Sequence, residues 1–270
     1  LNDTKISQKE LIGTLNTVIF CPEDLQLIKG SPSGRRRFLD MEISQTSATY
    51  YHQLLQYNRL LQQRNTLLKE YRGKQNIPLA EWDVQLADMA AFIVKKRMES
   101  LKKINLLIDL MNRKLTGGLE NLTIGYEQPY MDNGSLEYTK EGFYERIKAA
   151  LPQDRHRMTT SVGPHRDDLR FFSDAMDLKK FGSQGQQRTA VLSLKLSELE
   201  FIKSEVGEYP VLLLDDVLSE LDESRRTNLL QFIHKRIQTF ITTTDIHDFK
   251  DLKSVQFISC EGGQVQYGQP

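Results

Sequence analysis

Two adjacent carboxylates, Asp215 and Asp216, follow a short apolar run. The four residues before them, 211–214, are all apolar, which is typical of a strand buried inside a sheet. A carboxylate at the carboxyl end of such a strand can hold Mg²⁺ beside nucleotide phosphates, and a second can orient or deprotonate a water molecule. The alternative is a buried strand that ends in a helix-capping aspartate. Asp215 and Asp216 are therefore the candidate catalytic residues, with Asp215 the candidate magnesium ligand.

A polar cluster that contains a glycine, Ser183-Gln184-Gly185-Gln186, opens a predicted amphipathic helix over 184–206. Unpaired amide groups and the positive dipole end make a helix start attractive to anions, and glycine leaves room for close approach. The alternative is an ordinary helix start capped by Ser183. That alternative explains the serine but not the glutamines. The cluster therefore predicts a phosphate-binding edge.

The elements that position these residues alternate between strand and helix. Strands are predicted at 14–20, 169–172, 211–215 and 240–244, a helix at 224–235, and a terminal hairpin from 255–259 and 264–267. Such alternation favours a parallel α/β sheet, with 211–215 and 240–244 buried on both faces. Between the first strand and the next region, Gly30, Pro32 and Gly34 predict a turn-rich break.

Residues 43–116 show helical spacing of apolar side chains. One stripe runs from Ile43 to Tyr71 with Ser47 and Arg64 as polar interruptions, and a second helix follows Pro78 and stops at 117–118. A short break between two long helices predicts an antiparallel hairpin. The rival interpretation is a self-associating coiled coil.

Composition narrows the class of protein. Lysine plus arginine and aspartate plus glutamate both number 36, so a surface that is basic throughout is not expected. Local basic clusters remain as DNA-binding candidates, each with a solvated helix face or a structural ion pair as the alternative: Arg35-Arg36-Arg37, Lys95-Lys96-Arg97, Lys102-Lys103 and Arg155-His156-Arg157. The chain has no run of about 18 apolar residues, so it is not expected to span a membrane. Cys21 and Cys260 are the two cysteines, which excludes a zinc site and predicts a cytoplasmic protein.

A phosphate-binding loop of the form G-x-x-x-x-G-K-[ST] does not occur in the sequence. Without that loop and its lysine, we expect the chain alone not to bind or hydrolyse ATP appreciably. The chain opens at Leu1 rather than methionine, which favours a piece of a longer protein.

Five segments in order resemble the RecF family of ABC/SMC-type ATPases: 22–40, 161–171, FGSQGQQRT at 181–189, PVLLLDDVLSELD at 210–222 and ITTTD at 241–245. The resemblance implies a DNA replication and repair ATPase that acts in the DNA-damage (SOS) response. It implies a protein that binds DNA, forms a homodimer with ATP and Mg²⁺ between its subunits, and works with RecR and RecO in loading RecA.

The resemblance also assigns roles to single positions. Ser183, Gln184, Gly185 and Gln186 would face the γ-phosphate of ATP held by the opposite protomer, Asp215 would serve Mg²⁺, Asp216 the hydrolytic water, and Asp222 the dimer contact.

Two positions depart from the wider ABC pattern. Asp216 stands where a glutamate is usual, and this shorter base implies slow turnover. A switch histidine is missing after the last strand, which leaves Thr244 or Asp245 as its substitute. The segment after Phe20 resembles a Q-loop, with Cys21 near the glutamine position and Glu23 as a carboxylate, or Pro22 simply starts a loop with Glu23 solvated.

These observations predict an α/β ABC-type ATPase head lobe with a parallel sheet and an inserted α-helical hairpin arm. The expected domains are 1–36 as the end of the first ATPase lobe, 37–152 as the arm, and 153–270 as the lobe with the signature, Walker B and D-loop motifs. The lobe with the Walker A loop would be supplied by about a hundred further residues. There are two alternatives. One is another SMC-type head, which would carry a much longer arm than this sequence allows, and the other is a non-catalytic interaction module.

Overall fold

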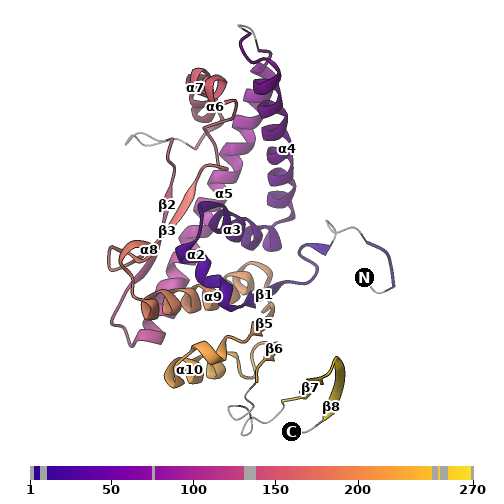
Figure 1. Cartoon of the computed structure of the whole chain (residues 1–270), viewed down its shortest axis with the longest axis vertical. Coiled ribbons are helices and arrows are strands. Elements are labelled where there is room, and N and C mark those ends of the chain that lie inside the picture. The colour runs from indigo at the N-terminus through magenta and orange to yellow at the C-terminus, as the bar shows by residue number, and fades with distance from the viewer. Residues whose placement is uncertain are drawn as a thin grey trace.

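The computed structural model describes residues 3–6, 11–74, 77–130, 138–244, 249 and 255–268. Figure 1 shows an elongated molecule in which a pair of long helices projects from a mixed α/β base. This arrangement confirms the predicted fold class, a parallel sheet in an ATPase-like lobe with an inserted helical hairpin. Among the helices of the described residues, none combines the length and apolarity needed to cross a bilayer.

The arm is built from three helices. α3 (Pro32–Thr46) leads into α4 (Ala48–Glu70), and α5 (Ala80–Thr116) returns beside α4 toward the base (Figure 1). α5 ends where Gly117 adopts the left-handed conformation, with φ of 67°. The predicted antiparallel hairpin is thus confirmed.

The prediction of one helical stripe from Ile43 to Tyr71 is wrong, because the chain breaks at Ser47. Ser47 is extended, with φ of −145° and ψ of 97°, and its hydroxyl accepts the Tyr50 amide to cap α4. The predicted turn-rich break around Gly30 is also shorter than expected. Pro32 occupies the first turn of α3, where its missing N–H costs nothing, so the helix runs through Gly34.

Within the described residues, three sheets form the rest of the framework. β1 (Thr17–Phe20), β5 (Val211–Asp215) and β6 (Thr239–Thr242) are parallel in the order β1-β5-β6. β2 (Leu122–Glu127), β3 (Asp168–Ser173) and β4 (Met176–Asp177) are antiparallel, and β7 (Phe257–Glu261) and β8 (Gln264–Gly268) form the predicted hairpin. The shorter helical elements are η1 (Pro22–Leu25), α2 (Gln26–Lys29), α6 (Lys140–Ala149), α7 (Leu151–Arg157), α8 (Leu178–Phe181), η2 (Leu218–Glu220) and α10 (Glu223–Ile233).

The parallel sheet is less enclosed than its sequence predicts. Ile19, Leu213 and Phe240 lie in register across the three strands, and the first and last are 51% and 53% exposed. Burial of both β5 and β6 on both faces was therefore a wrong prediction. One face of the sheet is covered by α9 (Gln184–Val206), while the other keeps apolar side chains in contact with solvent.

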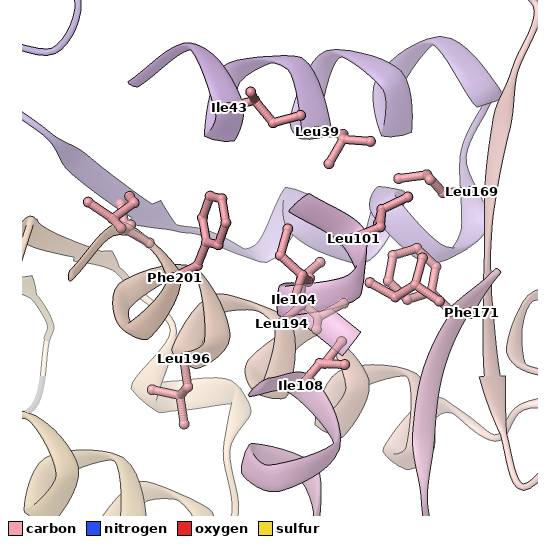
Figure 2. Close-up of a cluster of buried hydrophobic side chains, with 14 of the residues drawn as sticks. Leu39, Ile43, Leu101, Ile104, Ile108, Leu169, Phe171, Leu194, Leu196 and Phe201 are labelled. Atoms are coloured by element: carbon pink, nitrogen blue, oxygen red, sulfur yellow. The ribbon is translucent and has the colours of Figure 1, made fainter. Parts of the chain in front are cut away.

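The core sits where α9 crosses α5. α9 was predicted to be amphipathic, yet nearly every side chain between 187 and 202 is buried, because sheet, arm and α3 surround the helix. Figure 2 shows the resulting cluster of side chains from four elements: Leu39, Ile43, Leu101, Ile104, Ile108, Leu169, Phe171, Leu194, Leu196 and Phe201. The arm helix α5 and the signature-bearing helix α9 therefore share one hydrophobic core.

The predicted domain boundaries at 36/37 and 152/153 fall inside α3 and α7.

Candidate functional site

The paired aspartates end β5 on the surface of the molecule. The hydroxyl of Thr242 on β6 donates to Asp215 Oδ1 at 2.7 Å, and Thr242 Oγ1 accepts the Asp216 amide at 3.0 Å. Asp216 adopts φ of +51°, a conformation that short polar residues tolerate better than most, and its carbonyl accepts from Ser219. One threonine thus orients two neighbouring residues. Both carboxylates are exposed, so they are available to a metal ion or a water molecule.

The opening turn of α9 combines a capping box with open amides. Ser183 Oγ accepts the Gln186 amide at 3.2 Å, and Gln186 Oε1 accepts the Ser183 amide at 3.0 Å. The capping role foreseen for Ser183 is therefore confirmed. Ser183, Gln184 and Gly185 are exposed, and the amides of Gln184 and Gly185 donate to no group within the described part of the chain.

Gly185 is not explained by the fold. An added Cβ would meet only Ser183 Oγ, at 4.0 Å, and the residue does not need a positive φ. Glycine costs about 1 kcal/mol relative to alanine within a helix. At this exposed helix start, the missing side chain leaves the backbone open to close approach by an external group.

The first turns of α9 lie next to the carboxyl ends of β1 and β5. Arg188 and Val191 of α9 line a small hollow together with residues at or after the ends of these strands: Phe20, Cys21, Pro22, Leu25, Val217 and Leu221. The structure thus packs the second and third turns of α9 against the segments that follow β1 and β5.

Asp222 begins α10 as its N-cap. Its carboxylate accepts the Arg225 amide at 2.9 Å and pairs with the Arg225 guanidinium. The bond from this amide, more than the guanidinium, holds the pKa of Asp222 below its ordinary value. Asp222 is exposed, as a dimer contact would need to be.

The Q-loop and switch positions are less well defined. Burial, followed by the charge of Asp24, raises the pKa of the Cys21 thiol to about 11, so this side chain stays protonated and is a poor ligand for Mg²⁺, which prefers oxygen. Glu23 is exposed, and so is Thr244 beyond the end of β6. Asp245 lies outside the described residues.

Two arginines named as DNA-binding candidates are buried instead. Arg35 forms a two-pronged ion pair with Asp168, at 2.7 and 2.8 Å. Arg97 is 2% exposed and binds both oxygens of Asp40 as well as the Pro164 carbonyl. A role for these two in DNA binding is wrong, because their guanidinium groups are used inside the fold.

The remaining members of those clusters stay near the surface. Arg37 and Lys95 are exposed, Arg36 donates to the Asp167 carbonyl, and Lys96 pairs with Glu99.

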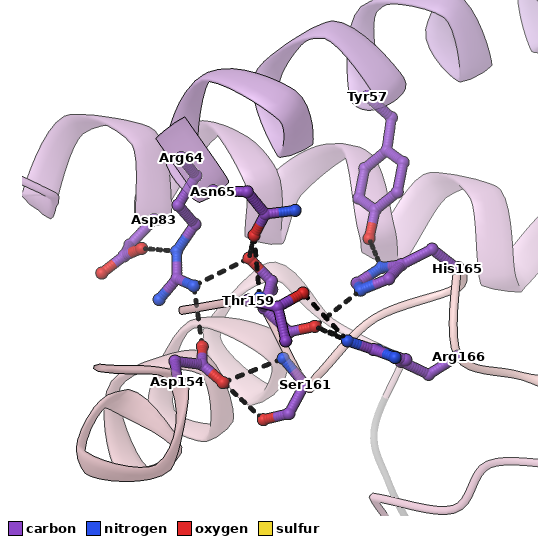
Figure 3. A network of polar contacts seen from close by, with 10 residues as sticks. Tyr57, Arg64, Asn65, Asp83, Asp154, Thr159, Ser161, His165 and Arg166 are labelled. Carbon is purple, nitrogen blue, oxygen red and sulfur yellow. Dashed lines mark hydrogen bonds and ion pairs between the residues drawn. The ribbon is translucent and has the colours of Figure 1, made fainter. Parts of the chain in front are cut away.

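A polar network that joins the two arm helices to α7 was not foreseen from the sequence. Figure 3 shows Arg64 of α4 bonded to Asp83 of α5 and to Asp154 of α7, both through buried ion pairs. Beside it, His165 Nε2 donates to the Thr160 carbonyl, so its Nδ1 must accept the Tyr57 hydroxyl at 2.6 Å. Burial lowers the pKa of His165 to about 4, which keeps the ring neutral. The run of charged and polarizable side chains at 165–168 is the sequence signal that could have pointed to it.

The parallel sheet, the exposed Asp215 and Asp216 and the open helix start at 183–186 define an ABC-type ATPase lobe that carries an inserted helical arm. A comparison with family models found no match to the chain. The DNA replication and repair protein RecF of Alkaliphilus oremlandii is 50% identical over 250 residues, covering 92% of this chain and 68% of the relative. That of Halalkalibacterium halodurans is 45% identical, covering 95% of this chain and 71% of the relative. The chain belongs to the RecF family.

Solved structures agree with this assignment. The recombination mediator protein RecF with ATPrS, from the RecFOR pathway, superposes with a TM-score of 0.87 at 37% identity, covering 97% of this chain and 70% of that one. The RecF–ATP structure gives a TM-score of 0.85 at 38% identity, covering 96% of this chain and 69% of that one.

Proposed function

We propose that this chain is the signature-bearing part of a RecF-type repair ATPase and that its α9 edge meets ATP held by an opposite protomer. The observation that carries the proposal is Gly185, which the fold does not require, beside the open amides of Gln184 and Gly185. These amides would donate to the γ-phosphate oxygens of the partner's nucleotide. Ser183 and Gln186 would hold the turn in shape through their capping box.

Asp215 and Asp216 would act on the nucleotide bound to their own protomer. The exposed Asp215 carboxylate, held on one oxygen by Thr242, fits a magnesium ion, which typically takes one or two carboxylates and completes its shell with phosphates and water. Asp216 would orient or deprotonate the attacking water, with slow turnover because its side chain is short. Asp222 would touch the partner near the nucleotide, and Thr244 would stand in for the switch residue.

Family membership and the RecF–ATP neighbours support a wider proposal, in which ATP-driven dimerisation acts on DNA. The exposed Arg37 and Lys95, with Arg36 and Lys96 near them in sequence, would attract DNA phosphates without sequence preference. In this role the dimer would help RecO and RecR to load RecA at gaps in DNA. ATP would act as a switch for assembly.

A direct test uses the full-length relative from Alkaliphilus oremlandii as the ATP-holding protomer. We expect the tagged relative to capture this chain when Mg-ATP is present, and not without it. Replacement of Gly185 by glutamate should abolish capture, because a carboxylate would block and repel the γ-phosphate. Asp216→Asn is the matched control and should leave capture unchanged, since Asp216 would serve the nucleotide of its own protomer.

The same experiment separates the rival function. Capture that is equally strong without ATP, and that is unchanged when Gly185 is replaced by glutamate, would favour a non-catalytic interaction module and overturn the ATPase proposal. Isothermal titration of the isolated chain with Mg-ATP is expected to show no appreciable binding.

A further inference from the structure

The turn between α5 and β2 contains a carboxylate, Glu120, that is bonded to three different elements. Glu120 Oε1 accepts from Gln186 Nε2 at 3.0 Å, and Oε2 accepts from the Ser173 hydroxyl at 3.0 Å. Its backbone carbonyl accepts from Asn112 Nδ2 at 2.9 Å. Glu120 thus joins the end of the arm helix, the end of β3 and the start of α9.

The bond to Gln186 determines which way the Gln186 amide faces. Because Glu120 is a pure acceptor when ionised, the Gln186 nitrogen must point toward it and the oxygen must point away. That oxygen is the atom that accepts the Ser183 amide in the capping box. Removal of the Glu120 carboxylate would let the amide turn over, and the cap on Ser183 would be lost.

A second contact links α5 to α9. The Ser193 hydroxyl of α9 is shared between the Thr189 carbonyl at 2.8 Å and Asn112 Oδ1 of α5 at 3.1 Å, inside the core. Asn112 therefore holds both Glu120 and the body of α9. α9 is thus linked to the end of α5 and the turn after it by two contacts: the buried one between Ser193 and Asn112, and the partly exposed one between Gln186 and Glu120.

We propose that Glu120 is a positioning residue that holds the Ser183–Gln186 turn in the shape needed to receive a triphosphate. This inference rests on the proposed function of that turn. Glu120 does not touch the nucleotide; it acts through Gln186. The charged acceptor makes the bond stronger than a neutral one, which suits a half-exposed position where water competes.

An exchange of carboxylate and amide tests the contact. Glu120→Ala removes the acceptor, and Gln186→Glu places two carboxylates against each other. Each single variant should need about tenfold more ATP for half-maximal capture by the full-length relative. The double variant Glu120→Gln/Gln186→Glu rebuilds the bond with its partners reversed, and it keeps the capping box because glutamate is favoured at that position. It should recover most of the loss.

A merely structural role would show as a lower melting temperature in parallel with weaker capture, whereas a positioning role weakens capture at an unchanged melting temperature. Wild-type ATP dependence in Glu120→Ala would overturn the positioning role while leaving the proposed function intact.

Hydrogen exchange of the isolated chain provides a readout that does not depend on ATP. Glu120→Ala should speed exchange at the backbone amide of Ser183, and leave the far end of α9 near Lys203 unchanged. If the relative captures no wild-type chain, the proposed function fails, and the exchange measurement alone tests the Glu120 contact. Unchanged exchange at Ser183 would overturn that contact.

Discussion

Arg64 and Asp154, separated by 90 residues in the chain, form an ion pair at 2.7 Å in which both side chains are fully buried. Each charge has left water for a low-dielectric interior, where its main compensation is the other partner and the bonds around it. This pair joins α4 of the arm to α7 beside it.

Replacement of Arg64 by alanine should therefore destabilise the chain strongly. Asp154 and Asp83 would remain buried without their shared cation, and loss of one partner of a buried pair typically costs roughly 3–5 kcal/mol. Urea denaturation gives the free energy of unfolding. Lys96→Ala breaks an ion pair that is about half exposed and should cost under about 1 kcal/mol. Equal losses in the two variants would contradict this account of the network.

Gly163 is required by its surroundings. It has φ of +131°, and a Cβ at this position would lie 2.4 Å from the Tyr57 hydroxyl oxygen. Gly163→Ala should cost roughly 1–3 kcal/mol, from the strained backbone and the displaced tyrosine. Gly34→Ala is the matched control, since Gly34 lies in α3 with nothing within 4 Å, and it should stabilise the chain by up to about 1 kcal/mol. Thermal unfolding of both variants checks the contrast.

Glu42 should make stability depend on pH. Burial raises its pKa from 4.5 to about 7, against the opposing charge of Lys195, with Glu198 and Asp24 also facing it. Between these values the folded chain keeps a proton that the unfolded chain has lost, so this group makes the fold less stable as pH rises. Glu42→Gln cannot lose a proton. The free energy of unfolding of Glu42→Gln minus that of the wild type should therefore rise by more than about 1 kcal/mol between pH 5 and pH 8. A constant difference would argue against the raised pKa.

DNA binding should depend on the exposed cations and on salt. Arg37→Glu and Lys95→Glu should each weaken the binding of a labelled oligonucleotide and reduce the slope of log K against log salt by about 1. Fluorescence anisotropy of the isolated chain measures both quantities. Lys114→Glu, an exposed cation at the far end of α5, should leave binding unchanged. The same loss in all three variants would indicate a general charge effect and not a defined surface.

Local patterns predicted much of this architecture because the physics behind them is local. The bounds of α9 follow from Ser183 as its cap and from Gly207, which takes φ of 90° at its end. The break at Ser47 was missed for a related reason, since a serine on an apolar stripe looks like an interruption although it can also cap a new helix.

Long-range pairing is what the sequence does not reveal. Arg64 and Arg97 resemble solvated cations when only their neighbours in the chain are considered. Their partners Asp154 and Asp40 lie 90 and 57 residues away, and only the folded chain brings them together. The same applies to Glu120, whose bond to Gln186 spans 66 residues.

α5 is a single helix of 37 residues, which gives it a length of about 55 Å. Near one end it carries Asp83, bonded to Arg64 of α4, and near the other Asn112, bonded to Ser193 of α9. In a rigid helix of this length a tilt of one degree at one end displaces the other end by about 1 Å. We therefore expect a partner that binds the tip of the arm to shift α9, the helix that begins after Ser183.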